Sequence, residues 1–327
     1  MARQQRIEFE GAYYHVMARG DRAEVIAETD DDREDFVTTM GRACERTGAR
    51  IHAWVLMSNH YHWLLETPGG NLVETMGWFQ NTYTRRFNVR NGRWGHVFGG
   101  RYKSVLLDSS DGNGDYFRIL LDYIHLNPAR AGMVDPEKGL GLLDYRWSSL
   151  SQGYGVRGSE RAGAWMEVGS GLGLFQCEDT AVGRRRFIER LEQRAIAEAD
   201  RAGISRPNEQ TLQSTLRRGW YWGSEAWKET LLGLPINESL DREHGFSEQG
   251  RARAEVMAEE IVRGMLKEAK LREEDLERLS GSDRRKVDVA VELSRKTSVS
   301  QRWIADRLAM RSASNVSQQL YRRRGEK

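Results

Sequence analysis

Residues 57–66, "MSNHYHWLLE", place two histidines one residue apart in a run that is typical of a buried strand. Successive side chains of a strand point to opposite faces of the sheet, so we expect His60 and His62 to share one face and Tyr61 to face the core on the other. Two neighbouring imidazoles suit a metal ion or a phosphate. An isolated pair of this kind is more often structural, so a second motif is needed to assign a site.

The sequence around this stretch predicts alternating strands and helices. Apolar and β-branched runs predict strands at 12–18, 49–58, 59–67 and 99–110. Helical spacing predicts a helix capped by Asp30 or Asp31, a second over 72–88, and a third over 115–128 that Pro128 ends. This order is that of an α+β, ferredoxin-like fold, in which an antiparallel sheet carries helices on one face.

The motif "DYIHLNP" (122–128) lies in the third predicted helix. Tyr123 and Asn127 are four residues apart and share a helix face, whereas His125 points away. A helix beside the central strand would bring both residues to the histidine pair. His60, His62 and the Asn127 amide oxygen would then bind a divalent metal, and Tyr123 would attack a phosphorus atom. The alternatives are a half-buried helix tyrosine and a simple helix-end asparagine.

Three ordered motifs, "MSNHYHWLLETP", "RWGHVFGGRYKS" and "DYIHLNPARAGMV", resemble the REP-associated tyrosine transposases of the single-tyrosine HUH family over residues 7–150. The resemblance implies a metal-dependent single-stranded DNA endonuclease and strand transferase that acts on hairpins of short palindromic repeats. It implies that Tyr123 is the nucleophile, which leaves a 5′ phosphotyrosine and a free 3′ hydroxyl. It also implies that His60, His62 and Asn127 bind Mg²⁺ or Mn²⁺.

Between residues 81 and 104 the sequence is basic and contains no acidic residue, which favours contact with DNA phosphates. The predicted contacts are Arg85, Arg86, Arg90, Arg93, Arg101 and Lys103. Interleaved aromatic residues either stack on unpaired bases or cover the core: Tyr83, Phe87, Trp94, Phe98 and Tyr102. We expect structural roles for His15, His52 and His125. Glu66 shares the face of His60 and His62 and is a weak candidate for a further ligand.

The remaining sequence suggests a connecting, mainly helical region (151–240) and a helical DNA-binding domain (241–327), after a nuclease domain at 1–150. Tryptophans at 216–232 are expected to pack against the nuclease domain or close a small core, with base stacking as an alternative. Residues 238–252 are expected to form an exposed linker.

The C-terminal residues 252–324 resemble the DNA-binding domain of the replication initiator DnaA and predict a helix-turn-helix in which Ser300 caps the first helix. Residues 299–327 carry seven Arg or Lys and two Asp or Glu. In the generic geometry the second helix enters the major groove of duplex DNA. The predicted base contacts are the side chains of Ser314, Asn315, Ser317 and Gln318, which we expect to be exposed, and the predicted phosphate contacts include Arg311 and Arg322. A plain helical bundle with a basic tail is the alternative.

The composition is compatible with these interpretations but does not select among them. The 327 residues carry a net charge of only +2, and Cys44 and Cys177 lie far apart, as is typical of a reducing compartment. We expect a cytoplasmic, nucleoid-associated protein without a membrane segment, acting as a monomer or homodimer on single-stranded, hairpin and double-stranded DNA. The alternative function is a non-catalytic, sequence-specific DNA-binding regulator derived from a transposase.

Overall fold

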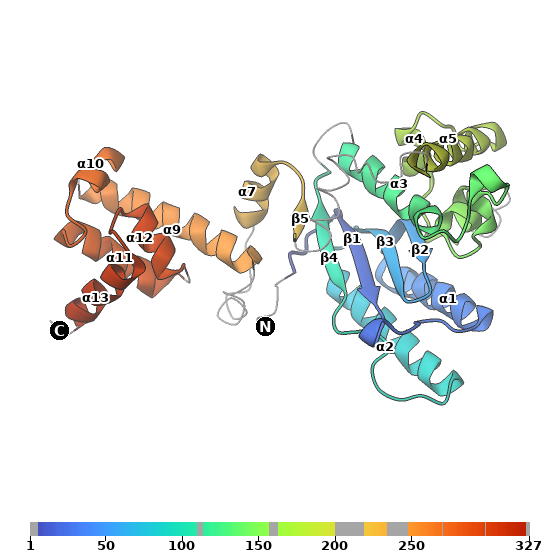
Figure 1. Cartoon of the computed structure of the whole chain (residues 1–327), viewed down its shortest axis with the longest axis horizontal. Helices are drawn as coiled ribbons and strands as arrows, with labels where there is room; N and C mark the ends of the chain where they lie inside the picture. The colour runs from blue at the N-terminus through green and yellow to red at the C-terminus, as the bar shows by residue number, and fades with distance from the viewer. Residues whose placement is uncertain are drawn as a thin grey trace. The chain divides into compact units, whose positions relative to one another are not determined.

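The computed structural model describes residues 6–109, 114–156, 163–199, 219–233, 248–269, 271–297 and 299–324. The chain divides into two compact units, residues 6–228 and residues from 229 onward (Figure 1). In the described part of the chain, no helix combines the length and the apolar character that crossing a membrane requires.

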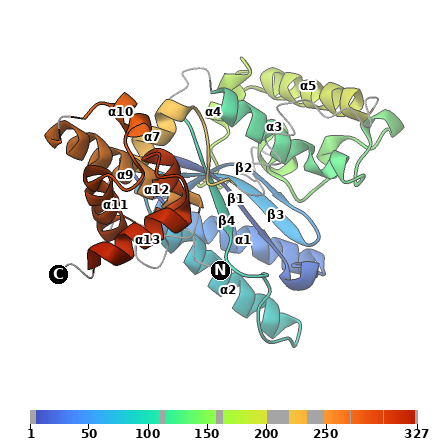
Figure 2. The ribbon, with the colours of Figure 1, turned by 60° about the vertical axis from the view of Figure 1, so that its left-hand side comes forward.

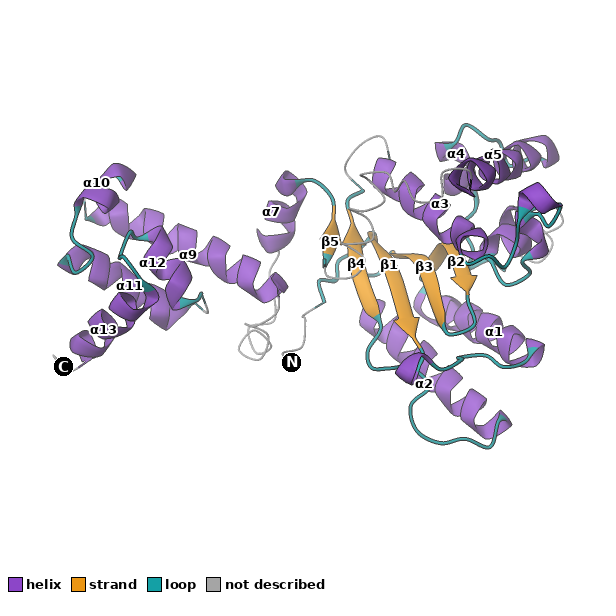
Figure 3. Cartoon of the chain, viewed as in Figure 1, coloured by secondary structure: helices purple, strands orange, loops and turns teal. Residues whose placement is uncertain are grey.

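The first unit is built on a five-stranded sheet of order β2-β3-β1-β4-β5 (Figure 3). Its strands are β1 (Ala12–Arg19), β2 (Arg50–Leu56), β3 (His60–Thr67), β4 (Lys103–Leu107) and β5 (Tyr221–Trp222). Neighbours among the first four are antiparallel, and β5 runs parallel to β4. The predicted α+β class is confirmed.

Helices cover both faces of this sheet. Trp63 of β3 packs against Phe36 of α1 (Asp30–Thr47) and Phe79 of α2 (Leu72–Arg90). The next residue, Leu64, points the other way and joins a core with Leu121 of α3 (Asp115–Arg130). Figures 1 and 2 show α1 and α2 on one side of the sheet and α3 on the other. The prediction of helices on one face is therefore wrong, because both faces of the central strands are apolar and need cover.

Two predicted helix ends are also corrected. Thr29, rather than Asp30 or Asp31, caps α1, because its hydroxyl accepts the Asp32 N–H. Pro128 lies inside α3, which continues to Arg130. The helix is ended instead by Gly132, whose φ of 69° allows the paired bonds Met133 N–H to Pro128 O and Gly132 N–H to Ala129 O.

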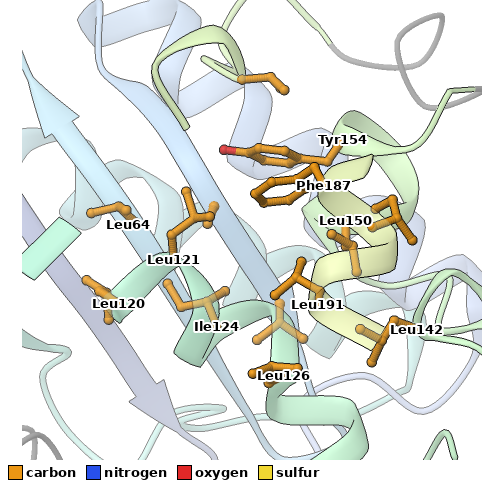
Figure 4. Close-up of a cluster of buried hydrophobic side chains, with 14 of the residues drawn as sticks. Leu64, Leu120, Leu121, Ile124, Leu126, Leu142, Leu150, Tyr154, Phe187 and Leu191 are labelled. Carbon is orange, nitrogen blue, oxygen red and sulfur yellow. The ribbon is translucent and has the colours of Figure 1, made fainter. Parts of the chain in front are cut away.

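Residues beyond 150 complete the core over α3. A short π-helical segment (Leu150–Tyr154) is followed by α4 (Gly169–Leu174) and α5 (Ala181–Ala199). Tyr154, Phe187 and Leu191 pack with Leu121 and Ile124 of α3 in one cluster (Figure 4). The hydrophobic core of the first unit therefore continues across residue 150. Trp222 joins the same core, which is the expected packing of the tryptophan-rich segment against the sheet unit.

Short 3₁₀ turns link these elements at Asp21–Ala23, Pro136–Lys138 and Leu142–Asp144, and α7 (Glu225–Gly233) follows β5. Both cysteines are buried and free.

The second unit has a helical core of its own. It contains α9 (Glu248–Glu268), α10 (Glu273–Arg278), α11 (Arg284–Lys296), α12 (Gln301–Arg307) and α13 (Ala313–Arg324). Ser300 caps α12 as predicted, and Ile304, Leu308, Val316 and Leu320 are buried. Residues 238–247 of the predicted linker lie outside the described residues, and residues 248–252 belong to α9.

Candidate active site

His60 and His62 lie on one face of β3 with ring centroids 5.1 Å apart, as the alternation predicts. The Asn59 amide sets the tautomer of His60. Its Nδ2 donates to the Ala23 carbonyl at 3.1 Å, so its Oδ1 faces the imidazole and accepts from His60 Nδ1 at 2.8 Å. Because Nδ1 carries the proton, the Nε2 lone pair of His60 is left for a ligand.

His15 on β1 completes a row of three imidazoles that the sequence did not reveal. Its Nε2 lies 2.9 Å from His62 Nδ1, and the two rings stack with centroids 5.0 Å apart. His15 is buried and hydrogen-bonded, as its expected structural role requires, and its partner is a candidate ligand. The strand pattern of "AYYHVMA" shows only that His15 alternates with its neighbours; the register that pairs it with Leu64, beside His62, comes from the folded sheet.

Burial favours the neutral form of these histidines. It lowers the pKa of His62 well below its ordinary value, with the neighbouring His15 and His60 adding to the effect. Burial also lowers the pKa of His60, helped by the nearby Arg19. Neutral imidazole is the form that binds a metal ion, and a hydrogen bond at Nδ1 orients the ring for binding through Nε2.

Tyr123 of α3 lies against the buried histidines. Its ring centroid is 5.5 Å from that of His62 and 6.2 Å from that of His15, edge to face in both cases. The tyrosine is half-buried. The structure therefore brings together His62 and Tyr123, which are 61 residues apart in the chain.

Asn127 lies one helical turn beyond Tyr123, and its Nδ2 donates to the Tyr123 carbonyl at 2.9 Å. Near the start of α3, Phe117 packs on His52 of β2, whose Nε2 lies 3.0 Å from Glu66 Oε2 near the end of β3. Further along α3, Tyr123 packs on His62 near the start of β3, so α3 runs antiparallel to β3. The turn from Tyr123 to Asn127 advances about 6 Å, close to the step of roughly 6.6 Å from His62 to His60. Asn127 is thereby carried toward the level of His60.

These donors fit a small divalent ion with open positions. In the described ranges, no three His, Cys, Asp or Glu side chains form a group that could hold a metal. The predicted ligand set consists of two imidazoles and the amide oxygen of Asn127, whose amide nitrogen donates to the Tyr123 carbonyl. Two nitrogens and one oxygen leave coordination positions for water and phosphate. Glu66 is not part of this set, because its carboxylate is committed to His52 Nε2 at 3.0 Å.

Three cations lie near the candidate site. Arg19 is paired with His60 across β1 and β3, and Lys103 occupies the same row of the sheet as Met17 and His62. The guanidinium of Arg130 lies 5.4 Å from the centroid of the Tyr123 ring. Positive charge contributed by β1, β4 and α3 suits a phosphate group.

In the fold, ion pairs neutralise part of the positive charge of the predicted DNA-contact stretch at 81–104. Acidic residues in or just before the first turns of α1 pair with three arginines of this stretch: Arg86 with Asp35 at 3.1 Å, Arg90 with Asp32 at 3.1 Å, and Arg93 with Glu28. Arg85 and Arg101 are exposed. Tyr83, Phe87, Phe98 and Tyr102 are buried and cover the core, whereas Trp94 is 92% exposed.

In the second unit, Ser314, Ser317 and Gln318 lie on the exposed side of α13, and Arg311 and Arg322 are also exposed. The prediction of an exposed side chain is wrong for Asn315. Its amide nitrogen donates to the carbonyls of Met310 at 2.8 Å and Gly281 at 3.2 Å, which holds the turn before α13.

The comparisons with known proteins bear on the first unit. Residues 8–126 match the family model described as "Transposase IS200 like". The matched span comprises β1–β4, α1, α2 and most of α3, and it contains His60, His62 and Tyr123. It covers a little over a third of the chain.

One solved structure, described as a REP-associated tyrosine transposase bound to a REP hairpin, is 16% identical. The similarity covers 46% of this chain and 84% of that one, with a TM-score of 0.37. No curated protein matches the chain.

Proposed function

We propose that the protein is a metal-dependent single-stranded DNA endonuclease and strand transferase that acts on hairpin-forming palindromic repeats. The observation that carries this proposal is the contact between Tyr123 and the buried His62, whose ring centroids are 5.5 Å apart. A candidate nucleophile and a candidate metal ligand from distant parts of the chain thus share one site. The IS200-like match of residues 8–126 supports a DNA transposase role.

In this mechanism His60, His62 and Asn127 would hold Mg²⁺ or Mn²⁺, and the bound ion would supply positive charge that polarises the scissile phosphate. The Tyr123 hydroxyl attacks the phosphorus, a Tyr123 Oη–P bond forms, and the P–O3′ bond breaks. The phenol proton is transferred in net terms to the departing 3′ oxygen. The products are a 5′ phosphotyrosine and a free 3′ hydroxyl, and attack by another 3′ hydroxyl reverses the reaction and joins strands.

For the second unit we propose binding to duplex DNA through α12 and α13. The exposed polar side chains of α13 and the exposed Arg311 and Arg322 support this role. The duplex would be a hairpin stem or the flank of the cleavage site.

The test is a hairpin oligonucleotide with a single-stranded 5′ flank, labelled at its 3′ end and incubated with the full chain and Mg²⁺ or Mn²⁺. The 3′ label is required because a 5′ phosphotyrosine keeps the 3′ fragment on the protein. We expect a covalent adduct that Tyr123→Phe abolishes and Tyr116→Phe retains, since Tyr116 is a half-buried tyrosine in the first turn of the same helix. Tight, metal-independent duplex binding without any adduct would support the regulator instead.

A further inference from the structure

Arg130 occupies the last position of α3 and lies on the helix face that carries Tyr123 and Asn127. Its guanidinium carbon lies 5.4 Å from the centroid of the Tyr123 ring. Side chains of a helix lean toward its N-terminus, which explains how a residue seven positions later covers Tyr123. A permanent positive charge therefore lies beside the candidate nucleophile.

A carboxylate from α5 holds Arg130 in this position. Glu198 accepts from Arg130 Nε at 2.9 Å through Oε2 and from Arg130 Nη2 at 3.1 Å through Oε1. Such a two-point fork fixes the plane of a guanidinium, whereas a single contact would let it rotate. The two side chains are only 28% and 20% exposed, so solvent competes weakly for the contact.

Glu198 is itself anchored to α3 through a network. Arg194 Nε donates to Glu198 Oε1 at 2.9 Å, and Arg194 also pairs with the buried carboxylate of Asp122. Arg190 completes the group by donating to Asp122 Oδ2 at 3.0 Å. Three arginines and two carboxylates leave a net charge of +1, so the network orients Arg130 without cancelling the positive charge of the group.

We infer that Arg130 is a catalytic residue that stabilises the negative charge developing at Tyr123 and the attacked phosphate, that Glu198 is its positioning residue, and that α5 therefore belongs to the catalytic apparatus. This inference rests on the proposed function. As Tyr123 Oη loses its proton and bonds to phosphorus, negative charge builds first on the phenol oxygen and then on the phosphate oxygens. A guanidinium already in place stabilises that charge without reorganisation.

The inference gives a role to a helix outside the family match. Residues 8–126 contain neither Arg130 nor α5. The sequence suggested a connecting region at 151–240, but Phe187 and Leu191 of α5 pack in the core over α3. The same helix thus supplies both the apolar support for α3 and the carboxylate for its terminal arginine.

The experiment compares Arg130→Gln, Arg130→Lys and Glu198→Gln in the full chain. The first readout is the ionisation of fluorotyrosine incorporated at position 123 and followed by fluorine NMR without DNA or metal. Loss of the positive charge in Arg130→Gln should raise the pKa of this phenol by on the order of half a unit, and Arg130→Lys should restore most of it. Glu198→Gln should change the phenol signal less but broaden it, because the guanidinium is no longer held.

The second readout is the single-turnover rate of adduct formation with the labelled hairpin. We expect Arg130→Gln to slow it by about 10²-fold, with an intermediate loss for Glu198→Gln and partial rescue by Arg130→Lys. The matched control is Arg118→Gln, which removes an arginine of the same helix that stacks on Phe175 at 5.1 Å, away from Tyr123. This control should leave both readouts unchanged.

The outcomes separate the two proposals. If the unaltered chain forms no adduct, the proposed function fails, whatever the phenol titration shows. If the unaltered chain forms the adduct but Arg130→Gln changes neither the phenol ionisation nor the rate, the inference is overturned while the proposed function stands. Thermal unfolding of each variant identifies a loss of folding, and Arg130→Lys then decides, because it keeps the positive charge on a flexible side chain of nearly the same length.

Discussion

His15 and His62 are joined across neighbouring strands, with His15 Nε2 2.9 Å from His62 Nδ1. If His62 Nδ1 donates its proton to His15, the His62 Nε2 lone pair is free to bind a metal. If His15 donates instead, His62 carries its proton on Nε2 and cannot bind. The tautomer of a residue behind the site thus decides whether the candidate ligand is competent.

His15→Ala should weaken Mn²⁺ binding by about 10 to 100 fold, because His62 loses the partner that orients its ring. Isothermal titration calorimetry on the full chain measures this affinity without DNA. His15→Gln keeps a hydrogen-bonding group and should lose less. The control is His96→Ala, which removes an exposed histidine. Equal Mn²⁺ affinity in His15→Ala and the unaltered chain would refute the assigned role.

Trp94→Ala should weaken binding of a single-stranded oligonucleotide by about 1–3 kcal/mol, the usual contribution of one stacked base. Trp94 is 92% exposed, so its ring faces solvent and does not pack against the protein. Its loop is held by Asn88 Nδ2, which donates to the Gly95 carbonyl at 2.9 Å. Fluorescence anisotropy of a labelled strand gives the affinity. Val89→Ala removes an 80% exposed apolar side chain from the end of α2 and should have little effect. A similar loss in both variants would argue against stacking.

The joint substitution of Arg311 and Arg322 by alanine should weaken duplex binding. It should also reduce the slope of log affinity against log salt concentration by about 2, because two expected phosphate contacts are removed. Binding is measured from low to moderate salt by anisotropy. For comparison, Arg285→Ala and Arg295→Ala remove arginines that pair with Asp283 and Glu292 in the same unit. An unchanged slope in the first variant would exclude Arg311 and Arg322 as phosphate contacts.

Lys286→Met should destabilise the second unit by about 1–3 kcal/mol, because buried carbonyls lose their donor. The buried Lys286 Nζ donates to the carbonyls of Leu276 at 2.7 Å and Ala309 at 2.9 Å, and so ties the end of α10 to the turn after α12. Faster hydrogen exchange in α11 to α13 of the full chain reports the loss. Lys296→Met removes an exposed lysine of the same helix and should leave exchange unaltered. Protection in Lys286→Met equal to that of the unaltered chain would contradict this structural role.

The sequence predicts the parts of the site that depend on local periodicity. Alternation along β3 places His60 and His62 on one face, and the four-residue spacing on α3 aligns Tyr123 with Asn127. These features depend only on the geometry of one strand and one helix.

Features that depend on register or on distant residues could not be read in the same way. His15 meets His62 only because β1 pairs with β3 in a particular register, and Glu198 meets Arg130 across 68 residues of chain. The basic stretch at 81–104 seemed unopposed because its acidic partners, among them Asp32 and Asp35, come from another helix. Asn315 seemed exposed because its backbone acceptors lie outside its own helix.

The central claim is that Tyr123 forms a covalent bond to DNA. Mass spectrometry of the protease-digested adduct, after nuclease trimming of the hairpin oligonucleotide, locates the modified residue directly. The proposed function predicts a nucleotide phosphate mass on the peptide that contains Tyr123, with fragment ions that assign it to that residue, and no such mass in Tyr123→Phe. A modification on any other residue, or strand cleavage without a covalent intermediate, would contradict it.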